Sequence, residues 1–166
     1  MRTTLLLLTL ATLLVACRDG GSGGGAGGAT SREQVEASTS ERAKEAIPLI
    51  SEALGATRTE ATAQWESCMA ISWRYAAFAS LTAPAGDSSA QLEEVRAALT
   101  GAGYDDATQV DGHVTVTRDD TTVDVQPSPA RGKGVWVVQV QSSCADYDGD
   151  DREQVENGEA RPLDGL

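Results

Sequence analysis

The chain has 166 residues and carries 25 acidic against 13 basic side chains, a formal net charge of −12 at pH 7. So negative a chain is repelled by the phosphates of nucleic acid and by anionic lipid headgroups, so we expect no nucleic-acid partner. The same charge favours neutral or cationic partners, and the length corresponds to about one domain.

The N-terminal 16 residues predict an export signal. Met1 and Arg2 form a short positive segment, and residues 5–15 are apolar apart from two threonines. This stretch has the length of a signal-peptide core and is shorter than the about 20 apolar residues of a membrane-spanning helix. It ends in Leu-Val-Ala-Cys at residues 14–17, which resembles the lipobox of bacterial lipoproteins. The resemblance implies that Cys17 receives a diacylglyceryl group and becomes the first residue after cleavage.

Residues 17–31 predict a lipidated cysteine followed by a tether. A glycine-rich run follows Cys17, and about 14 residues of such a flexible coil have a root-mean-square reach of about 20 Å. The two acyl chains of a diacylglyceryl group anchor durably, so we expect the domain to stand on the extracytoplasmic face of a cell membrane. An ordinary secretory signal that contains a cysteine, or a retained N-terminal helix, is the alternative.

The chain has three cysteines, of which two remain once Cys17 is lipidated. In an oxidising compartment we expect Cys68 and Cys144 to form a disulfide. We expect it to join the start of the first strand to the end of the last, as between neighbouring antiparallel strands. Two free thiols or a metal pair are the alternatives, although two cysteines and one histidine make a poor zinc site.

The first predicted helix begins at Ser31, because Ser31 and Gln34 have the spacing of a capping box. Apolar residues then recur at helical spacing as far as Leu54. Pro48 falls inside this pattern, so we expect a kinked or split helix that stops at Gly55.

Residues 64–78 alternate between larger apolar and smaller or polar side chains. The alternation predicts one strand with an aromatic-rich face, although the alanines also permit a helix. Trp73 and Tyr75 lie on that face. These two rings either supply bulk to the core or, if exposed, mark a contact surface.

A second helix is predicted from Ser88, with Gln91 completing a capping box and an apolar stripe running to Leu99. Gly101 or Gly103 ends it.

Three strands follow, of which residues 113–118 and 121–126 form a hairpin across Asp119-Asp120. The most apolar strand, residues 135–141, is predicted to lie centrally in the sheet. A short strand over residues 107–110 would pair across Asp111-Gly112, a favoured hairpin dipeptide.

This element order predicts an α+β domain over residues 32–145, with two helices packed on one face of an antiparallel sheet of about four strands and one disulfide. Residues 146–166 are acidic and weakly apolar, which predicts a disordered tail.

The layout of residues 1–145 resembles the small actinobacterial lipoproteins of unknown function. The shared features are the lipobox, the glycine-rich tether, Trp65-x-x-Cys68 at a strand start, a capped helix at residues 92–99 and a last strand ending in a cysteine. The excess of arginine over lysine is typical of a high-GC genome. The resemblance implies an extracytoplasmic domain with one disulfide, and it implies no catalytic residue.

Candidate catalytic and metal-binding groups are few. The chain has one histidine, His113, and none of the common nucleophile, metalloprotease or phosphate-loop motifs. Residues 146–151 begin like a calcium loop at Asp146, Asp148 and Asp150, but the expected glycine and the closing glutamate are missing. Carboxylates in or beside structured segments are Glu66, Glu93, Glu94 and Asp124. We therefore expect no enzyme, no cofactor and no metal.

The function most consistent with these features is a non-catalytic interaction module that binds an envelope or secreted protein. A carrier of a lipid or small molecule between helices and sheet is the first alternative. A hydrolase that uses two carboxylates in a cleft is the second.

Overall fold

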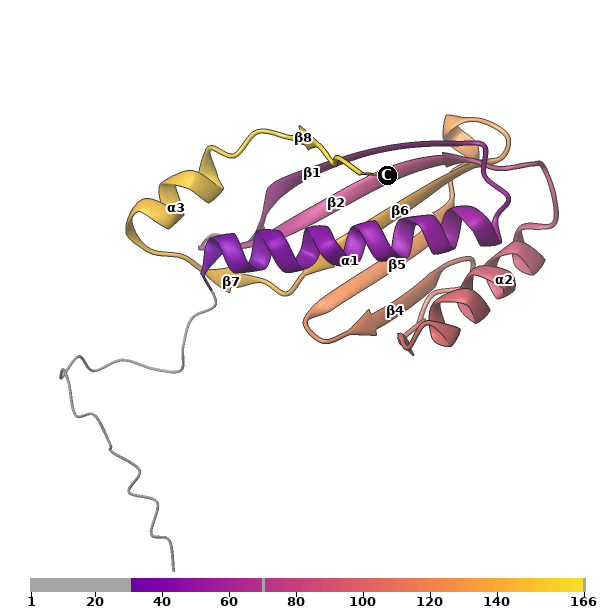
Figure 1. Ribbon diagram of the computed structural model, residues 1–166, viewed down its shortest axis with the longest axis horizontal. Helices are drawn as coiled ribbons and strands as arrows, with labels where there is room; N and C mark the ends of the chain where they lie inside the picture. The colour runs from indigo at the N-terminus through magenta and orange to yellow at the C-terminus, as the bar shows by residue number, and fades with distance from the viewer. Residues whose placement is uncertain (1–30, 70, 166) are drawn as a thin grey trace, which may run out of the picture.

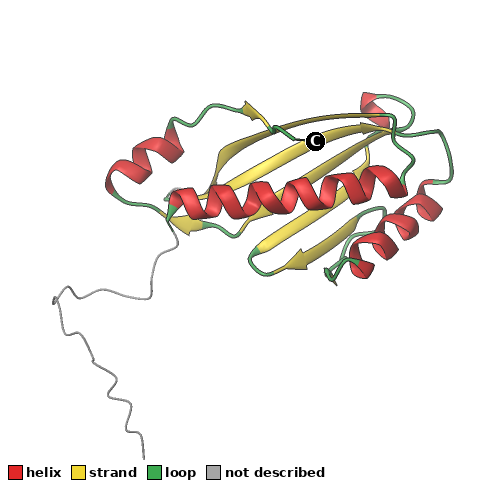
Figure 2. Ribbon diagram, in the orientation of Figure 1, coloured by secondary structure: helices red, strands yellow, loops and turns green. Residues whose placement is uncertain are grey.

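The computed structural model describes residues 31–69 and 71–165, and in this part of the chain helices cover one side of an antiparallel sheet (Figure 1, Figure 2). The predicted α+β class is confirmed. The predicted signal peptide, Cys17 and almost all of the tether lie outside the described residues.

The first helix, α1 (Arg32–Ala53), begins as the capping pattern predicted. The Gln34 amide donates to the Ser31 hydroxyl at 3.3 Å, and the Ser31 amide donates to the Gln34 side-chain oxygen at 3.2 Å. These bonds satisfy amides that a helix start otherwise leaves unpaired. The helix continues through Pro48 and is not split. Ile47 and Ile50 are both buried beside the proline, so packing holds the helix together there.

Residues 64–78 are not one strand, and that prediction is wrong. The chain forms a hairpin of β1 (Arg58–Met69) and β2 (Ser72–Thr82), in which Trp65 lies opposite Tyr75. The apolar alternation runs through the reversal because Met69 and Ile71 at the tip are apolar yet exposed. No glycine, proline, asparagine or aspartate marks this turn in the sequence.

The second helix is α2 (Ser88–Gly101), and its N-cap residue lies one position before the predicted Ser88. The Ala90 amide donates to an Asp87 carboxylate oxygen at 2.9 Å, so Asp87 is the cap and the Ser88–Gln91 capping box is wrong. Gln91 instead donates to the Pro84 carbonyl at 3.2 Å. The predicted apolar stripe is buried at Leu92, Val95 and Leu99.

The following strands are β3 (Asp105–Asp106), β4 (Val114–Arg118), β5 (Thr121–Pro127) and β6 (Val135–Ser142). The predicted hairpin is confirmed, with Arg118 opposite Thr121.

Residues 107–110 do not form the predicted strand, since the segment that pairs with β4 is β3. Asp111-Gly112 does form the predicted tight turn, since the His113 amide donates to the Val110 carbonyl at 3.3 Å. The Thr108 hydroxyl donates to the Thr115 carbonyl at 3.2 Å and accepts from the Thr115 amide at 3.0 Å. These side-chain bonds replace the backbone pairing that a strand would make.

The C-terminal segment is folded, so the predicted disorder of residues 146–166 is wrong for the described part. It contains β7 (Ala145–Asp146), α3 (Gly149–Glu156) and β8 (Arg161–Pro162). Tyr147 and Val155 are buried against Trp73. Two apolar anchors within an acidic segment were too few for composition to reveal.

The described sheet has the order β3-β4-β5-β6-β2-β1-β8, with β7 beside β2. The strand β6 is central, as predicted. The described chain has three α-helices and eight strands, so the prediction of two helices and about four strands was too low. Strands β3, β7 and β8 have two residues each, too few to show a periodicity.

We call the side of the sheet that meets the helices the covered face. Its side chains pack against buried Ala43, Ile47 and Ile50 of α1 and against the apolar stripe of α2. Every member is at most 6% exposed. The members are Tyr75, Ala77, Ala79, Leu81, Val114, Val116, Val123, Val125, Trp136, Val138 and Val140.

The predicted disulfide joins Cys68 to Cys144, with the two Cα atoms 6.3 Å apart. The prediction that the disulfide joins neighbouring strands is wrong. Cys68 lies at an irregularity near the end of β1, and Cys144 follows β6, while β2 runs between these strands. The disulfide therefore ties together the two flanks of β2.

Candidate functional site

The side of the sheet opposite the helices carries no helix in the described part, and we call it the open face. Alternation along the strands produces it: on β6, Val137 and Gln139 alternate with the buried Trp136 and Val138. The strand register places Gln139 between Phe78 of β2 and Asp124 of β5. The open face includes Glu60, Thr62, Gln64, Glu66, Arg74, Ala76, Phe78, Ser80, Thr115, Thr117, Thr122, Asp124, Gln126, Val137, Gln139 and Gln141.

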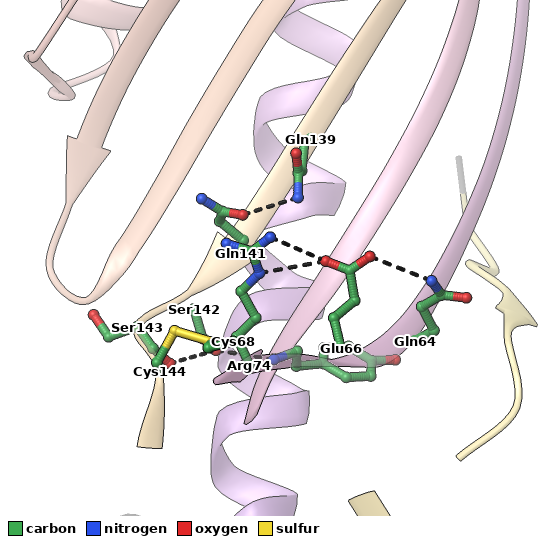
Figure 3. A network of polar contacts seen from close by, with 10 residues as sticks. Gln64, Glu66, Cys68, Arg74, Gln139, Gln141, Ser142, Ser143 and Cys144 are labelled. Atoms are coloured by element: carbon green, nitrogen blue, oxygen red, sulfur yellow. Dashed lines mark hydrogen bonds and ion pairs between the residues drawn. A yellow bond between two sulfur atoms is a disulfide. The ribbon is translucent and has the colours of Figure 1, made fainter. Parts of the chain in front are cut away.

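Polar side chains of the open face form one hydrogen-bonded group across β1 and β2 and another along β6 (Figure 3). The Arg74 guanidinium donates to one Glu66 oxygen at 3.2 and 3.3 Å, and the Gln64 amide donates to the other at 3.4 Å. On β6 the Gln139 amide donates to the Gln141 side-chain oxygen at 2.9 Å. The network leaves Glu66 and Arg74 paired on a solvent-facing surface.

The lone histidine lies beside this face, just before β4. His113 Nδ1 is 3.3 Å from both oxygens of Asp124, and the Thr115 hydroxyl donates to Asp124 at 2.7 Å. The arrangement holds the Asp124 carboxylate from two sides. A histidine–carboxylate pair needs a nucleophile within reach for acyl transfer, and the hydrogen bonds of the His113 side chain in the described residues go to Asp124.

The open face is poor in free charge, although the chain as a whole carries −12. The charged side chains described on it are Glu60, Glu66, Arg74 and Asp124, and none of them is without a partner. Between them lie the uncharged residues of β2 and β6. These include Phe78, the single phenylalanine of the chain, which is partly exposed.

A groove lies where α1, α3 and β8 meet the β1 side of the sheet. Its volume is about 500 Å³, and Trp65 and Tyr75 contribute aromatic surface to it. Arg32, Glu36 and Arg161 line it with charges of both signs. Burial raises the pKa of the Tyr75 phenol above its usual value, so this hydroxyl stays protonated at neutral pH.

Trp73 and Tyr75 do not form a contact surface, and that alternative is wrong. Each residue is 6% exposed. Both belong to the side of β2 that the helices cover. Trp73 packs with Tyr147 and Val155 under α3, and the Tyr75 ring lies 5.2 Å from that of Trp65.

The structure does not gather the three candidate calcium ligands into one site. Asp146 pairs with Ser72 in the sheet, Asp148 is at the N-cap position of α3 without a side-chain capping bond, and Asp150 lies in the first turn of α3. Among the described residues no group of three or more His, Cys, Asp or Glu side chains is placed to hold a metal ion.

The candidate hydrolytic carboxylates are also dispersed. Glu66 and Asp124 are held in the pairs described above, on different strands. Glu93 pairs with Arg96 on α2, and Glu94 is exposed beside it.

Sequence reasoning missed the open face as a site. The signal was present in the polar half of each alternating strand, at positions such as Thr115, Gln139 and Gln141. The alternation alone does not separate a contact surface from an ordinary solvated one at those positions.

No family model, curated protein or solved structure gives a significant match to the chain. Within the described residues no helix is long and apolar enough to cross a membrane. The candidate site therefore depends on the geometry of this chain alone.

Proposed function

We propose that the chain is an extracytoplasmic lipoprotein anchored to the cell membrane through Cys17, and that its domain is a non-catalytic interaction module. The open face is the proposed contact surface for an envelope or secreted protein. The observation that carries this proposal is the shortage of free charge on that face of a strongly acidic chain. Centres of protein interfaces are depleted in charged residues and enriched in aromatic ones, and Phe78 and Val137 lie on its middle strands.

Lipidation is tested by the mass of the chain purified from membranes. A diacylglyceryl group on the peptide that begins at Cys17 is the expected result. The variant Cys17→Ser is expected in the soluble fraction, and a membrane-bound Cys17→Ser chain would contradict the anchor.

The contact surface is tested by cross-linking the anchored chain to its neighbours in intact envelopes. Val137→Glu places an unpaired charge in the middle of the open face and should abolish the cross-linked product. Val110→Glu makes the same change at a residue 57% exposed in the loop before β4, and it should leave the product intact. Equal products from both variants would rule out the open face.

A carrier function is the second candidate, and the groove of about 500 Å³ beside Trp65 and Tyr75 favours it. Ligand sites are concave, with apolar walls and a few polar groups. Native mass spectrometry of the purified chain should then show a reproducible small adduct. In Gly158→Ala the added Cβ would lie 3.3 Å from the Trp65 ring. This substitution should disturb the groove and reduce the amount of adduct.

A further inference from the structure

Two large apolar side chains project from the tip of the β1–β2 hairpin. Met69 is 74% exposed and Ile71 is 59% exposed. Exposed Leu, Ile or Met side chains are common singly, but two within one turn place apolar surface at a single projecting point.

The hairpin tip lies at the end of the molecule where the chain enters α1 (Figure 1). Arg32, the first residue of α1, is 3.7 Å from Asp151 of α3. The strand β7, which leads into α3, pairs with Ser72 at the start of β2. Hence the residues next to the tip and the start of α1 share one end of the domain.

The tip is also held firmly. The residue before Met69 is Cys68, which is bonded to Cys144. On the other side of the turn, Ser72 and Trp73 pair with β7. The apolar side chains therefore project from a cross-linked edge of the sheet.

We propose that Met69 and Ile71 form a second membrane contact, which enters the interfacial layer of the bilayer to which Cys17 anchors the chain. This inference rests on the proposed lipidation. The tether connects Cys17 to α1 at the end that carries the tip, so it need not wrap around the domain for the tip to reach the lipid.

The charged residues near the hairpin tip indicate which lipid headgroups the tip can approach. Exposed Asp146 pairs with Ser72 next to the tip, exposed Asp148 follows two residues later, and the Arg152 guanidinium lies 5.4 Å from the centre of the Trp73 ring. The acidic neighbours are repelled by anionic headgroups. The contact is therefore apolar, and it fits a zwitterionic surface such as phosphatidylcholine.

The test uses Met69 as a native probe, since the only other methionine of the chain is Met1 in the signal segment. The lipidated chain on phosphatidylcholine vesicles is treated with chloramine-T, and sulfoxide on the Met69 peptide is followed by mass spectrometry. Exposed methionine oxidises readily, so we expect oxidation at least about fivefold slower on vesicles than for the Cys17→Ser chain in solution.

A matched pair of variants separates insertion from simple crowding by the membrane. Ile71→Asp should return the oxidation rate of Met69 to that of the free chain. Val110→Asp, at a similarly exposed apolar residue in the loop before β4, should leave the protection in place. An anchored wild-type chain in which Met69 oxidises at the free rate would overturn the proposal.

The two failures are distinguishable because the mass of the anchored chain reports on Cys17 separately. If the chain carries a diacylglyceryl group and Met69 is unprotected, the anchor stands and the tip contact is wrong. If the group is missing, the proposed anchor fails. The oxidation rate of Met69 is then measured on a chain coupled through Cys17 to a maleimide lipid. Protection of Met69 supports the tip contact, and oxidation at the free rate overturns it.

Discussion

The two faces of the sheet are built from the same strands and differ in almost every physical respect. On β6 the covered face has Trp136, Val138 and Val140, each at most 2% exposed. The alternate positions, Val137, Gln139 and Gln141, are partly exposed on the open face. The covered face supplies the apolar burial that stabilises the fold, whereas the open face contributes little to that burial.

The largest expected difference in stability between the two faces comes from substitutions at adjacent residues of β6. Trp136→Ala should lower the free energy of unfolding by about 3–5 kcal/mol, because it empties a large volume in the core. Val137→Ala, one residue along on the open face, should cost less than about 1 kcal/mol. Urea denaturation monitored by circular dichroism measures both. Equal losses would mean that both faces contribute to stability alike.

Removal of the disulfide should have the next largest effect on the free energy of unfolding. This effect should not depend on either face of the sheet. The two cysteines are 76 residues apart, so their bond restricts the unfolded chain strongly. The double variant Cys68→Ser, Cys144→Ser should lower the free energy of unfolding by up to about 4 kcal/mol. The wild type measured under reducing conditions is the control and should lose a similar amount. An unchanged urea midpoint in both would remove the disulfide as a source of stability.

The covered face was largely predictable from the sequence, whereas the role of the open face was not. Alternation at residues 114–118, 121–127 and 135–142 identified the strands, because one buried face imposes a period of two. The β1–β2 reversal was hidden because its tip is apolar, which continued the pattern that a core strand would show. The polar half of the same alternation locates the open face, but it does not indicate a role for that face, since solvent accepts any polar residue there.

The C-terminal segment was missed for a related reason. Its acidic composition is typical of a disordered chain, yet Tyr147 and Val155 suffice to fix α3 over Trp73. The partners of such anchors lie far away in sequence, so local composition does not report them. The disulfide was predictable from the cysteine count once Cys17 was assigned to the lipid anchor in an oxidising compartment, whereas its path across β2 depended on the strand order.

An ion pair at the margin of the covered face gives a smaller, pH-dependent effect. Hydrogen bonding from Arg118 of β4 holds the pKa of Glu45 on α1 below its usual value. A lowered folded-state pKa stabilises the fold above the unfolded-state pKa, near 4.5, and this stabilisation is lost as pH falls through the folded-state value. Because Glu45 is 40% exposed, Glu45→Gln should cost at most about 1 kcal/mol at pH 7.

The difference between Glu45→Gln and wild type should shrink towards zero as the pH is lowered below the folded-state pKa of Glu45. Urea midpoints measured from pH 7 downwards follow it. Glu41→Gln, at an exposed residue of the same helix, should show no such convergence. A gap between Glu45→Gln and wild type that persists in acid would assign the loss to packing instead of charge.

The smallest expected change in stability tests the role of the open face most directly. Gln139 donates to Gln141 at 2.9 Å in the middle of the sheet, but both side chains are partly exposed and water can replace the bond. Gln139→Ala should therefore change the free energy of unfolding by less than about 0.5 kcal/mol. If the same variant weakens the cross-linked product in envelopes, Gln139 contributes to contact and not to folding. A stability loss comparable to that of a covered-face residue would instead make the open face part of the structural core.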